Sequence, residues 1–366
     1  MSGFIFFSVA PFQGRYFQAL LDGSDLSGEV ISLRQLPWPT LRGGWSFLQR
    51  ISWREILEEK CAERRLKRKY AGVLYRLLLR LELLVVALSI KTLLDTKNPT
   101  GVAVWNGSHR YCRLLMALAP ASTRRFFFEN GLLPKTTTVD PLGVNYKNSL
   151  PRDPEFYRHR GIAIGGSSFV LAPRQSKRIL GAPVELPERF IFFPFQVDSD
   201  TQIRFFSPWV RDMRNFFSLA ERMAEACNLP VVFKEHPSSK DEYPDLHARA
   251  SDRLIFANAN GTEELIRRSL FVVTVNSTVG LEGLLCAKPV MTLGQACYNI
   301  EGLVAHADSE QSAIRLACDY PNWSLDDTVR EGFIQYLRDE YCIPGSWQQP
   351  DQEHIERVIE RLGSRG

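Results

Sequence analysis

The sequence predicts an α/β protein built from two Rossmann-like domains. Short apolar runs typical of buried strands alternate with helical segments in both halves of the chain, and this alternation indicates parallel sheets covered by helices. A chain of 366 residues is also long for one domain, so two are expected. We place the first domain at 1–175, with a helical insertion around 50–95. The second is placed at 185–345, followed by a terminal helix at 346–366.

The first half contains three strand-like runs. Phe4–Ala10 is followed by a Pro-Phe-Gln-Gly turn, after which a helix is expected from Arg15. Gly101–Trp105 and Arg125–Phe128 are the other two runs. The long segment Gly72–Leu94 is apolar but carries charged residues, which are costly at bilayer depth. We therefore expect a helix with a wide buried face rather than a membrane span.

The second half has the same alternation. Phe190–Phe193, Pro230–Glu235 and Leu270–Val275 are apolar enough to form buried strands, and a helix is expected over Val210–Cys227. A linker at Ala172–Glu188 separates this half from the first, and it contains three prolines together with both acidic and basic residues.

The composition is that of an ordinary globular protein with reduced cysteines. Hydrophobic residues make up 45% and charged residues 23% of the chain, with a net charge of +4, as in an ordinary globular protein. Seven cysteines without a CxxC pair suggest reduced thiols and a cytoplasmic location. The first residues lack the basic region of a signal peptide.

A basic cluster, Arg64–Lys69, precedes the long apolar segment. It is either a solvated helix face or a contact for anionic lipid headgroups, which attract such clusters by about 1 kcal/mol per cation. No nucleic-acid-binding motif accompanies it, so nucleic acid is not expected as a partner.

The strongest functional signal is the segment Asn276–Glu282 with His236 before it in the chain. Asn276–Glu282 follows a buried strand and opens a helix, which would aim free N–H groups at a phosphate above the strand ends. Glu282 could then reach a ribose hydroxyl. His236 ends another strand and is held there by Pro237. The two motifs predict a nucleotide-sugar site, although a plain helix cap and a loop histidine remain the alternative.

Six motifs follow one another along the chain: Phe128–Gly131, Gly143–Asn145, Ser149–Pro154, Gln196–Ile203, Lys234–Pro237 and Asn276–Glu282. In this order they resemble the capsule polysaccharide synthesis family of retaining bacterial β-Kdo glycosyltransferases. The similarity is especially strong to the single-module member that starts the capsule lipid linker, and it covers roughly residues 100 to 305.

This resemblance implies a GT-B-like enzyme with two facing domains and a cleft between them. It would transfer Kdo, an acidic eight-carbon sugar, from CMP-β-Kdo to a glycolipid or Kdo-terminated glycan acceptor with net retention. Retention by two displacements needs a carboxylate nucleophile. Asp200, in the Asp-x-x-Ile pattern, is the expected nucleophile and Asp198 the fallback. Both could instead cap a turn. No cofactor or metal is expected, although Asp-Ser-Asp superficially matches a metal-binding DxD motif.

The resemblance also implies roles for the other motif residues. Glu129 is the candidate base for the acceptor, and Arg152 would contact the Kdo carboxylate or an acceptor phosphate. Asn145 is a weaker candidate for the same contact. His236 is expected to assist departure of the CMP phosphate. The donor-binding set is Gln196, Lys234, His236, Pro237, Asn276, Ser277, Thr278, Gly280 and Glu282.

Two other functions stay open at this point. One is a CMP-sugar transferase of an O-antigen or capsule repeat with a different donor or acceptor. The other is a non-catalytic subunit that binds glycan or nucleotide within a capsule assembly complex. The expected location is cytoplasmic. Peripheral attachment to the inner face of the inner membrane stays open as an alternative, and so does contact with an anionic membrane surface or with other capsule assembly proteins.

Overall fold

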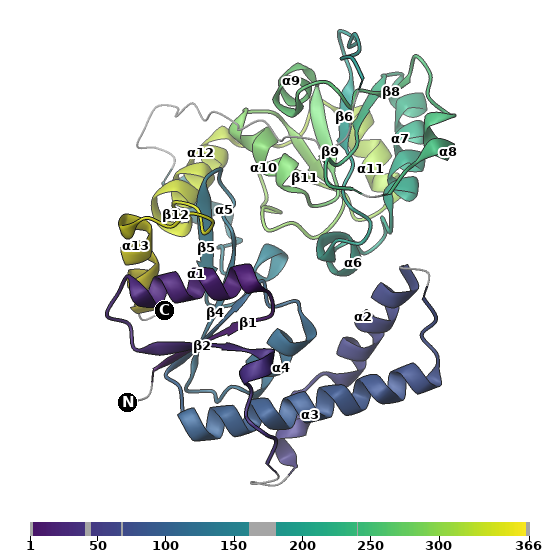
Figure 1. Cartoon of the computed structure of the whole chain (residues 1–366). Coiled ribbons are helices and arrows are strands. Elements are labelled where there is room, and N and C mark those ends of the chain that lie inside the picture. Colours follow the sequence, from purple (N-terminus) through teal and green to yellow (C-terminus); the bar gives the residue numbers. More distant parts are fainter. Residues whose placement is uncertain (1–2, 41–44, 67–68, 161–180, 240, 364–366) are drawn as a thin grey trace. The chain divides into compact units, whose positions relative to one another are not determined.

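The computed structural model describes residues 3–40, 45–66, 69–160, 181–239 and 241–363 (Figure 1). The chain forms two compact units, and it passes between them more than once. Unit 1 comprises Met1–Gly131, Lys135–Ser149 and Cys342–Gly366, and unit 2 comprises Leu132–Pro134 and Leu150–Tyr341. Each unit contains its own sheet of six strands, so the expected α/β class is confirmed.

Unit 1 has the sheet order β12-β5-β4-β3-β1-β2. Strands β1 to β4 are mutually parallel, whereas β5 and β12 run antiparallel to their neighbours. Its elements are β1 (Phe4–Ser8), α1 (Pro11–Asp22), β2 (Gly28–Ser32), η1 (Leu33–Gln35), η2 (Ser46–Arg50), α2 (Trp53–Leu66), α3 (Val73–Lys97), β3 (Gly101–Trp105), α4 (Arg110–Leu118), β4 (Arg124–Asn130), β5 (Thr136–Asp140), η3 (Asn145–Lys147), β12 (Ile343–Pro344) and α13 (Gln352–Gly363).

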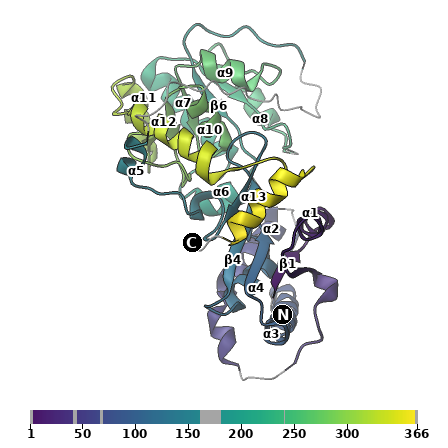
Figure 2. The ribbon, with the colours of Figure 1, turned by 90° about the vertical axis from the view of Figure 1, so that its left-hand side faces the viewer.

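The alternation of side chains along β1 divides the core of unit 1 in two. Phe4 and Phe6 pack with residues of α1 and α13 on one face of the sheet, whereas Ile5 and Phe7 pack with residues of α2, α3 and α4 on the other. This is the expected consequence of successive side chains pointing to opposite faces of a strand. Figure 2 shows α13 beside the β1 and β4 strands of this unit.

Helix α1 begins earlier than the sequence suggested. We expected a turn at Pro11–Gly14, but Pro11 is the first residue of the helix, where its fixed φ and missing N–H are tolerated. The Gln13 side chain folds back and accepts hydrogen bonds from the N–H groups of Val9 and Ala10, at 2.8 and 3.2 Å. These bonds cap the helix start, which explains why the turn signal was misleading.

Unit 2 has an entirely parallel sheet in the order β11-β10-β9-β6-β7-β8. Residues of α7 and α11 pack on one face, and α10 packs on β9, β10 and α9. The elements are α5 (Pro154–Arg158), β6 (Ile191–Pro194), α6 (Thr201–Phe206), α7 (Met213–Cys227), β7 (Val231–Lys234), α8 (Pro244–His247), β8 (Leu254–Phe256), α9 (Thr262–Arg268), β9 (Phe271–Thr274), α10 (Thr278–Leu285), β10 (Val290–Thr292), β11 (Ala305–His306), α11 (Glu310–Asp319), α12 (Asp327–Tyr336) and the π-helix η4 (Leu337–Tyr341).

The unit boundaries differ from those expected at 175 and 345. Residues 150–160 belong to unit 2 because α5 packs against α12, with Tyr157 fully buried beside Phe333 at a ring separation of 5.3 Å. Residues 342–363 belong to unit 1 because β12 pairs with β5 and α13 buries Val358 and Leu362 in its core. Some of the positions discussed above lie outside the described residues. They are the linker residues 172–180, which include the expected boundary at 175, and Lys67 and Arg68 of the basic cluster.

Helix α3 confirms the helix expected at Gly72–Leu94, and its burial is uneven along its length. In the earlier turns only one side of the helix is buried, through Leu79 and Leu83. In the later turns the residues from Ala87 to Ile90 are all buried, so the expected wide buried face holds only there. Among the helices that the structure describes, none is long and apolar enough to cross a membrane.

Candidate functional site

The carboxyl ends of β6 and β9 meet at the point where the strand order of unit 2 reverses. From β6 the chain proceeds to β7 and β8 on one side, then returns to β9 on the other side and continues to β10. In open parallel sheets, ligands bind at the carboxyl ends of the strands that flank such a reversal. Gln196 follows β6 and Asn276 follows β9, so two predicted donor-binding residues lie at this switch point.

Gln196 and Asn276 lock the two strand ends together. The Gln196 Nε2 donates to Asn276 Oδ1 at 3.0 Å, and its Oε1 accepts the Asn276 N–H at 3.2 Å. The same Oε1 accepts the Thr274 hydroxyl at 3.3 Å. All three residues are buried, where a polar group without a partner is costly. The network therefore fixes the geometry of both loops, and the Thr274 contact was not anticipated from the sequence.

The turn after Asn276 forms the start of α10 as expected. The Ser277 side chain is the N-cap and accepts the Val279 N–H at 3.1 Å, and Thr278, the first helical residue, is exposed. The start of a helix carries a partial positive charge and unpaired N–H groups. The arrangement can hold one phosphate at the carboxyl edge of the sheet. Glu282 follows on the same helix and is partly exposed.

Gly280 has a packing role that the sequence did not reveal. A Cβ placed on Gly280 would lie 2.3 Å from the hydroxyl oxygen of Tyr298. That hydroxyl donates to the Ser277 carbonyl at 2.5 Å, and Tyr298 is buried. The absence of a side chain at position 280 therefore lets Tyr298 support the turn from below. Nothing in the local sequence around Tyr298 signals this long-range contact.

Asp200 lies at the start of α6 and is exposed. Its carboxylate caps the helix by accepting the Gln202 N–H at 2.9 Å. The helix is in turn fixed to the switch point, because Asn276 Nδ2 donates to the carbonyls of Gln202 and Phe206 at 2.9 and 3.1 Å. The expected nucleophile is therefore at the start of a short helix that is hydrogen-bonded to Asn276, just before α10.

Asp198 has a different environment. One of its oxygens accepts the Met213 N–H at 2.8 Å and the other accepts the Tyr243 hydroxyl at 3.2 Å. Burial raises the pKa of the Asp198 carboxyl, and these two hydrogen bonds oppose the shift. Because both oxygens have protein partners, the side chain connects the β6 loop to the start of α7. Asp198 and Asp200 are thus two residues apart but structurally distinct.

His236 and Pro237 follow β7, and Lys234 ends that strand. The His236 Nδ1 accepts the Ser238 N–H at 3.2 Å. Strand β6 lies between β7 and β9, so His236 and Ser277 follow strands separated by roughly 10 Å. Lys234 Nζ donates to the carbonyls of Asn258 and Asn260 at 2.6 Å each, and burial lowers its pKa. The Lys234 ammonium therefore supports the β8–α9 loop.

Arg152 joins this region from a distant part of the sequence. We expected it in the first domain, but it belongs to unit 2, where its guanidinium donates to the Cys297 carbonyl. Cys297 directly precedes Tyr298, so Arg152 is positioned on the loop that supports the α10 turn.

Glu129 and Asn145 belong to unit 1. Glu129 lies at the carboxyl end of β4, where its carboxylate accepts hydrogen bonds from Asn106 Nδ2 and from the Asn130 N–H, at 2.5 and 2.8 Å. Asn106 follows β3, so this cluster also lies at strand ends. Asn145 begins η3 with a φ of 58°, in a loop whose ends are held by the buried carboxylate of Asp140.

A cavity of about 490 Å³ lies elsewhere in unit 2. Its lining comes from the segment around β11 and from the region after α11, and includes Asn299, Glu301, His306, Asp319 and Trp323. None of the predicted donor-binding residues is among the residues that line it.

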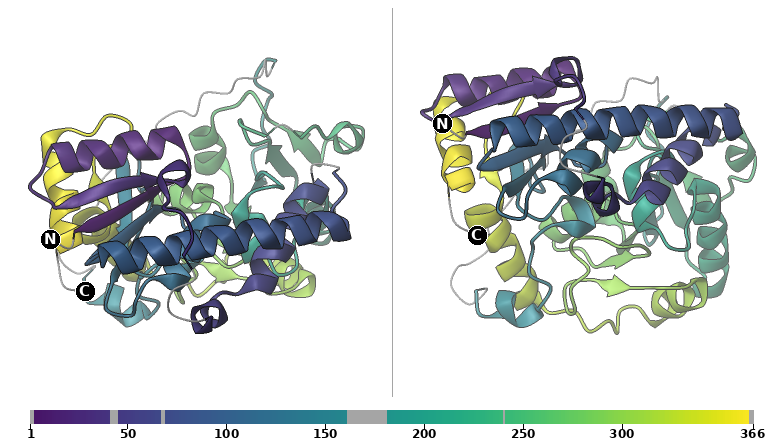
Figure 3. Two further views of the ribbon diagram at one scale, coloured as in Figure 1. Left: turned by 60° about the horizontal axis from the view of Figure 1, so that its bottom comes forward. Right: turned by 90° about the horizontal axis from the view of Figure 1, so that it is seen from below.

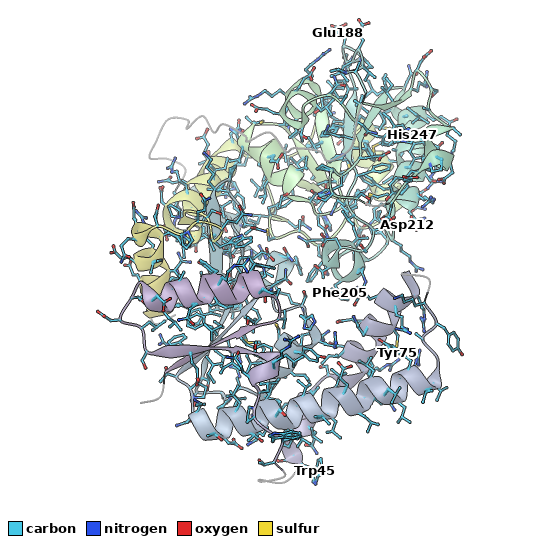
Figure 4. All side chains as sticks on the ribbon, in the orientation of Figure 1. Trp45, Tyr75, Glu188, Phe205, Asp212 and His247 are labelled. Atoms are coloured by element: carbon cyan, nitrogen blue, oxygen red, sulfur yellow. The ribbon has the colours of Figure 1, made fainter. Side chains whose placement is uncertain are left out.

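Figure 4 illustrates how the side chains of unit 2 are distributed around this sheet. Phe205, on α6, and Asp212, the N-cap of α7, follow the β6 loop, while His247 lies on α8. The His247 Nε2 contacts a Glu235 carboxylate oxygen at 2.6 Å. His247 therefore has a structural partner next to the His-Pro motif.

Two Rossmann-like units in one chain define a protein of the GT-B fold class. The solved structure of the β-Kdo 2,7 transferase KpsC of Thermosulfurimonas dismutans has this architecture, with a TM-score of 0.52 over 99% of this chain and 100% of that one, at 14% identity. Residues 172–337 match the family described as capsule polysaccharide biosynthesis protein. The resemblance to the capsule polysaccharide synthesis family is thereby confirmed.

Two curated relatives extend this similarity. Protein FixF of Sinorhizobium fredii is 39% identical over 262 residues, which cover 71% of this chain and 64% of FixF. The capsule polysaccharide export protein KpsS of Escherichia coli is 29% identical over 252 residues, covering 50% of this chain and 64% of KpsS. The matched region thus spans about two thirds of the length of either relative.

Proposed function

We propose that this protein is a retaining β-Kdo glycosyltransferase that uses CMP-β-Kdo as its donor. The observation that carries the proposal is the hydrogen-bonded pair Gln196–Asn276 at the switch point of unit 2, with the α10 start next to it. This site offers helix N–H groups suited to a single phosphate. The family match over residues 172–337 includes these motifs and favours a sugar nucleotide of capsule synthesis as the ligand.

In this proposal the donor phosphate is bound by the turn at Ser277 and Thr278. His236 approaches from the end of β7 and stabilises the negative charge that develops on the departing CMP. Glu282, in the middle of α10, binds the ribose. Lys234 contributes indirectly, because its ammonium group holds the Asn258 and Asn260 carbonyls.

Asp200 is the proposed nucleophile. Attack of its carboxylate on the anomeric carbon breaks the bond to the phosphate oxygen and releases CMP, giving an ester with inverted configuration. The acceptor hydroxyl then displaces the carboxylate from the opposite face and restores the original configuration. Asp200 suits this role better than Asp198, because it is exposed whereas both Asp198 oxygens accept hydrogen bonds from the protein.

The acceptor side of the reaction is assigned to unit 1. Glu129, held by Asn106 at the carboxyl end of β4, would take the proton of the acceptor hydroxyl in the second displacement. Arg152 on unit 2 would bind the Kdo carboxylate, for which its planar guanidinium is suited. A glycolipid or Kdo-terminated glycan is the proposed acceptor.

The experiment that tests the donor assignment is calorimetry with CMP in EDTA. We expect binding without added metal and a loss of at least tenfold in affinity for His236→Ala, about 1.4 kcal/mol. His247→Ala is the matched control, since His247 lies in the same unit but pairs with Glu235. Equal affinity of wild type and His236→Ala would refute the role of His236. CMP binding without transfer to any Kdo-terminated or lipid acceptor would favour a non-catalytic subunit.

A further inference from the structure

The first half of α3 presents an unusual row of exposed apolar side chains. Side chains on one face of these turns are between 50% and 85% exposed. At 100° per residue they fall within about 140° of the helix circumference. They face away from Leu79 and Leu83, which are buried in unit 1. We define the α3 stripe as Val73, Leu74, Leu77, Leu78, Leu81 and Val85.

Cationic side chains border the α3 stripe on one side. Arg76 and Arg80 are exposed, and neither forms an ion pair with a residue that the structure describes. The stretch from Val73 to Leu81 contains no acidic residue, and Glu82, which follows it, is paired with Arg110 at 3.0 Å. The stripe is therefore apolar in the middle and positive along one edge.

Exposed aromatic residues lie near both ends of the helix. Tyr70, two residues before the helix cap, is 87% exposed. Trp38 and Trp45 are 90% and 56% exposed. Thr40, two residues after Trp38, is tethered to the later part of α3 by a hydrogen bond between its N–H and Thr92 Oγ1 at 3.0 Å. Figure 4 shows Trp45 on the outer side of α3, away from the sheet. Such residues favour the boundary between headgroups and acyl chains.

The earlier turns of α3 expose the α3 stripe, whereas Ala87, Leu88 and Ile90 of the later turns are buried. Viewed from below, the helix crosses the front of the unit (Figure 3). An apolar stripe bordered by arginine and ending in exposed Trp and Tyr is typical of helices that lie in the membrane interface. We propose that the α3 stripe inserts into the headgroup region of an anionic lipid bilayer. This inference concerns unit 1 alone and does not require the proposed transfer reaction.

The arginines beside the α3 stripe indicate that its partner is an anionic membrane. Burying the stripe removes apolar surface from water, which favours any apolar partner. Arg76 and Arg80 would remain at the edge, where lipid phosphates can neutralise them. Arg64, which lies before the helix in the chain, adds positive charge near its start, because its guanidinium donates to the Tyr70 carbonyl at 2.7 Å and stacks on the Tyr75 ring.

Vesicle flotation with the full-length protein tests the proposal. Wild type should float with vesicles of mixed phosphatidylcholine and phosphatidylglycerol, and more weakly with phosphatidylcholine alone. The triple variant Leu74→Gln, Leu78→Gln, Leu81→Gln should lose at least tenfold in partitioning. Its melting temperature and CMP affinity should be unchanged, because exposed substitutions have small effects on stability.

A matched triple variant places the same changes outside the stripe. Leu142→Gln, Val184→Gln, Leu325→Gln alters exposed apolar residues of similar size and should float like wild type. Arg76→Gln with Arg80→Gln should reduce flotation only on anionic vesicles and weaken its dependence on salt. Equal flotation of wild type and the stripe variant would overturn the proposal. So would a change from dimer to monomer in the stripe variant without any change in flotation, which would identify a second copy as the occupant.

Discussion

The hydroxyl of Tyr298 occupies the space where a side chain at Gly280 would begin. The distance from an added Cβ to the Tyr298 hydroxyl oxygen would be 2.3 Å, and the nearest ring carbon would lie at 2.8 Å. The same hydroxyl donates to the Ser277 carbonyl. The buried ring of Tyr298 therefore requires a glycine at position 280 in the first turn of α10.

Gly280→Ala should lower the free energy of unfolding by about 1–3 kcal/mol, because the buried ring has to move. Urea denaturation measures this change. Gly14→Ala is the control, since its Cβ would meet nothing nearer than 3.4 Å and alanine is favoured inside a helix. In a Tyr298→Phe background the cost of Gly280→Ala should shrink, because the nearest atom is gone. If the losses in unfolding free energy from Gly280→Ala and Tyr298→Phe simply add in the double variant, the proposed contact between the two residues is wrong.

Gln196→Leu should destabilise unit 2 by about 1–3 kcal/mol, since the buried Asn276 N–H and Thr274 hydroxyl would lose their acceptor. CMP affinity should fall with it, because the α10 turn starts from Asn276. Thermal unfolding and calorimetry measure the two effects. Gln18→Leu, on the exposed face of α1, should change neither. If Gln196→Leu binds CMP with normal affinity, the hydrogen bonds of Gln196 to Asn276 and Thr274 are not needed for the CMP site.

Asp200→Ala should keep CMP affinity and lose transfer by several orders of magnitude, because the chemical step is removed rather than binding. After exposure of the wild type to CMP-Kdo, intact-protein mass spectrometry should reveal a Kdo-sized adduct. Digestion should map it to the peptide that contains Asp198 and Asp200. An adduct on Asp198 would leave the mechanism intact and reverse the choice between the two acids. Near-normal turnover of Asp200→Ala would refute its role as nucleophile.

Asp198→Asn should gain stability relative to wild type as pH rises. Burial raises the folded pKa of Asp198 above the ordinary value of 3.8, so the folded state holds this proton more tightly than the unfolded state. The contribution of the carboxyl is therefore fully present at low pH and declines as pH rises through the raised pKa. Asparagine does not titrate and can still accept from the Met213 N–H.

Denaturation of wild type and Asp198→Asn from about pH 3 to neutral measures this difference. Asp198→Ala provides the contrast, because it loses both the Met213 and Tyr243 contacts and should be destabilised throughout that range. A constant difference between wild type and Asp198→Asn would show that the carboxyl has the same affinity for protons in both states.

The sequence allowed prediction of the parts of the fold that depend on contiguous patterns. The runs at Phe190–Phe193 and Leu270–Val275 are strands, and Ser277 caps a helix as its position suggested. These features are set by neighbours in the chain, through side-chain periodicity and capping chemistry. The placement of Gln196 next to Asn276 also follows once two parallel strands are assumed to be adjacent.

Features that depend on distant contacts were not predictable in the same way. Arg152 precedes α5, and it belongs to unit 2 because α5 packs with α12, more than 160 residues later in the chain. The link between Tyr298 and Gly280 also depends on the loop between β10 and β11 folding back under α10. The outward-facing stripe of α3 was missed because apolar residues at helical spacing are usually buried, and periodicity alone does not show where a sheet ends.

The two ends of the chain meet in unit 1. Tyr16 on α1 and His354 on α13 are joined by a hydrogen bond of 2.9 Å, and β12 extends the sheet beside β5. During translation, domains tend to fold as they emerge, beginning with the N-terminal one. Here the first strands and helices emerge early but lack β12 and α13 until all of unit 2 has been made. Phe17 and Phe128, which pack in the same cluster as Val358 and Leu362, stay incompletely covered for that time. The core of unit 1 thus joins segments that are more than 200 residues apart, whereas nearly all of unit 2 comes from the continuous stretch Leu150–Tyr341.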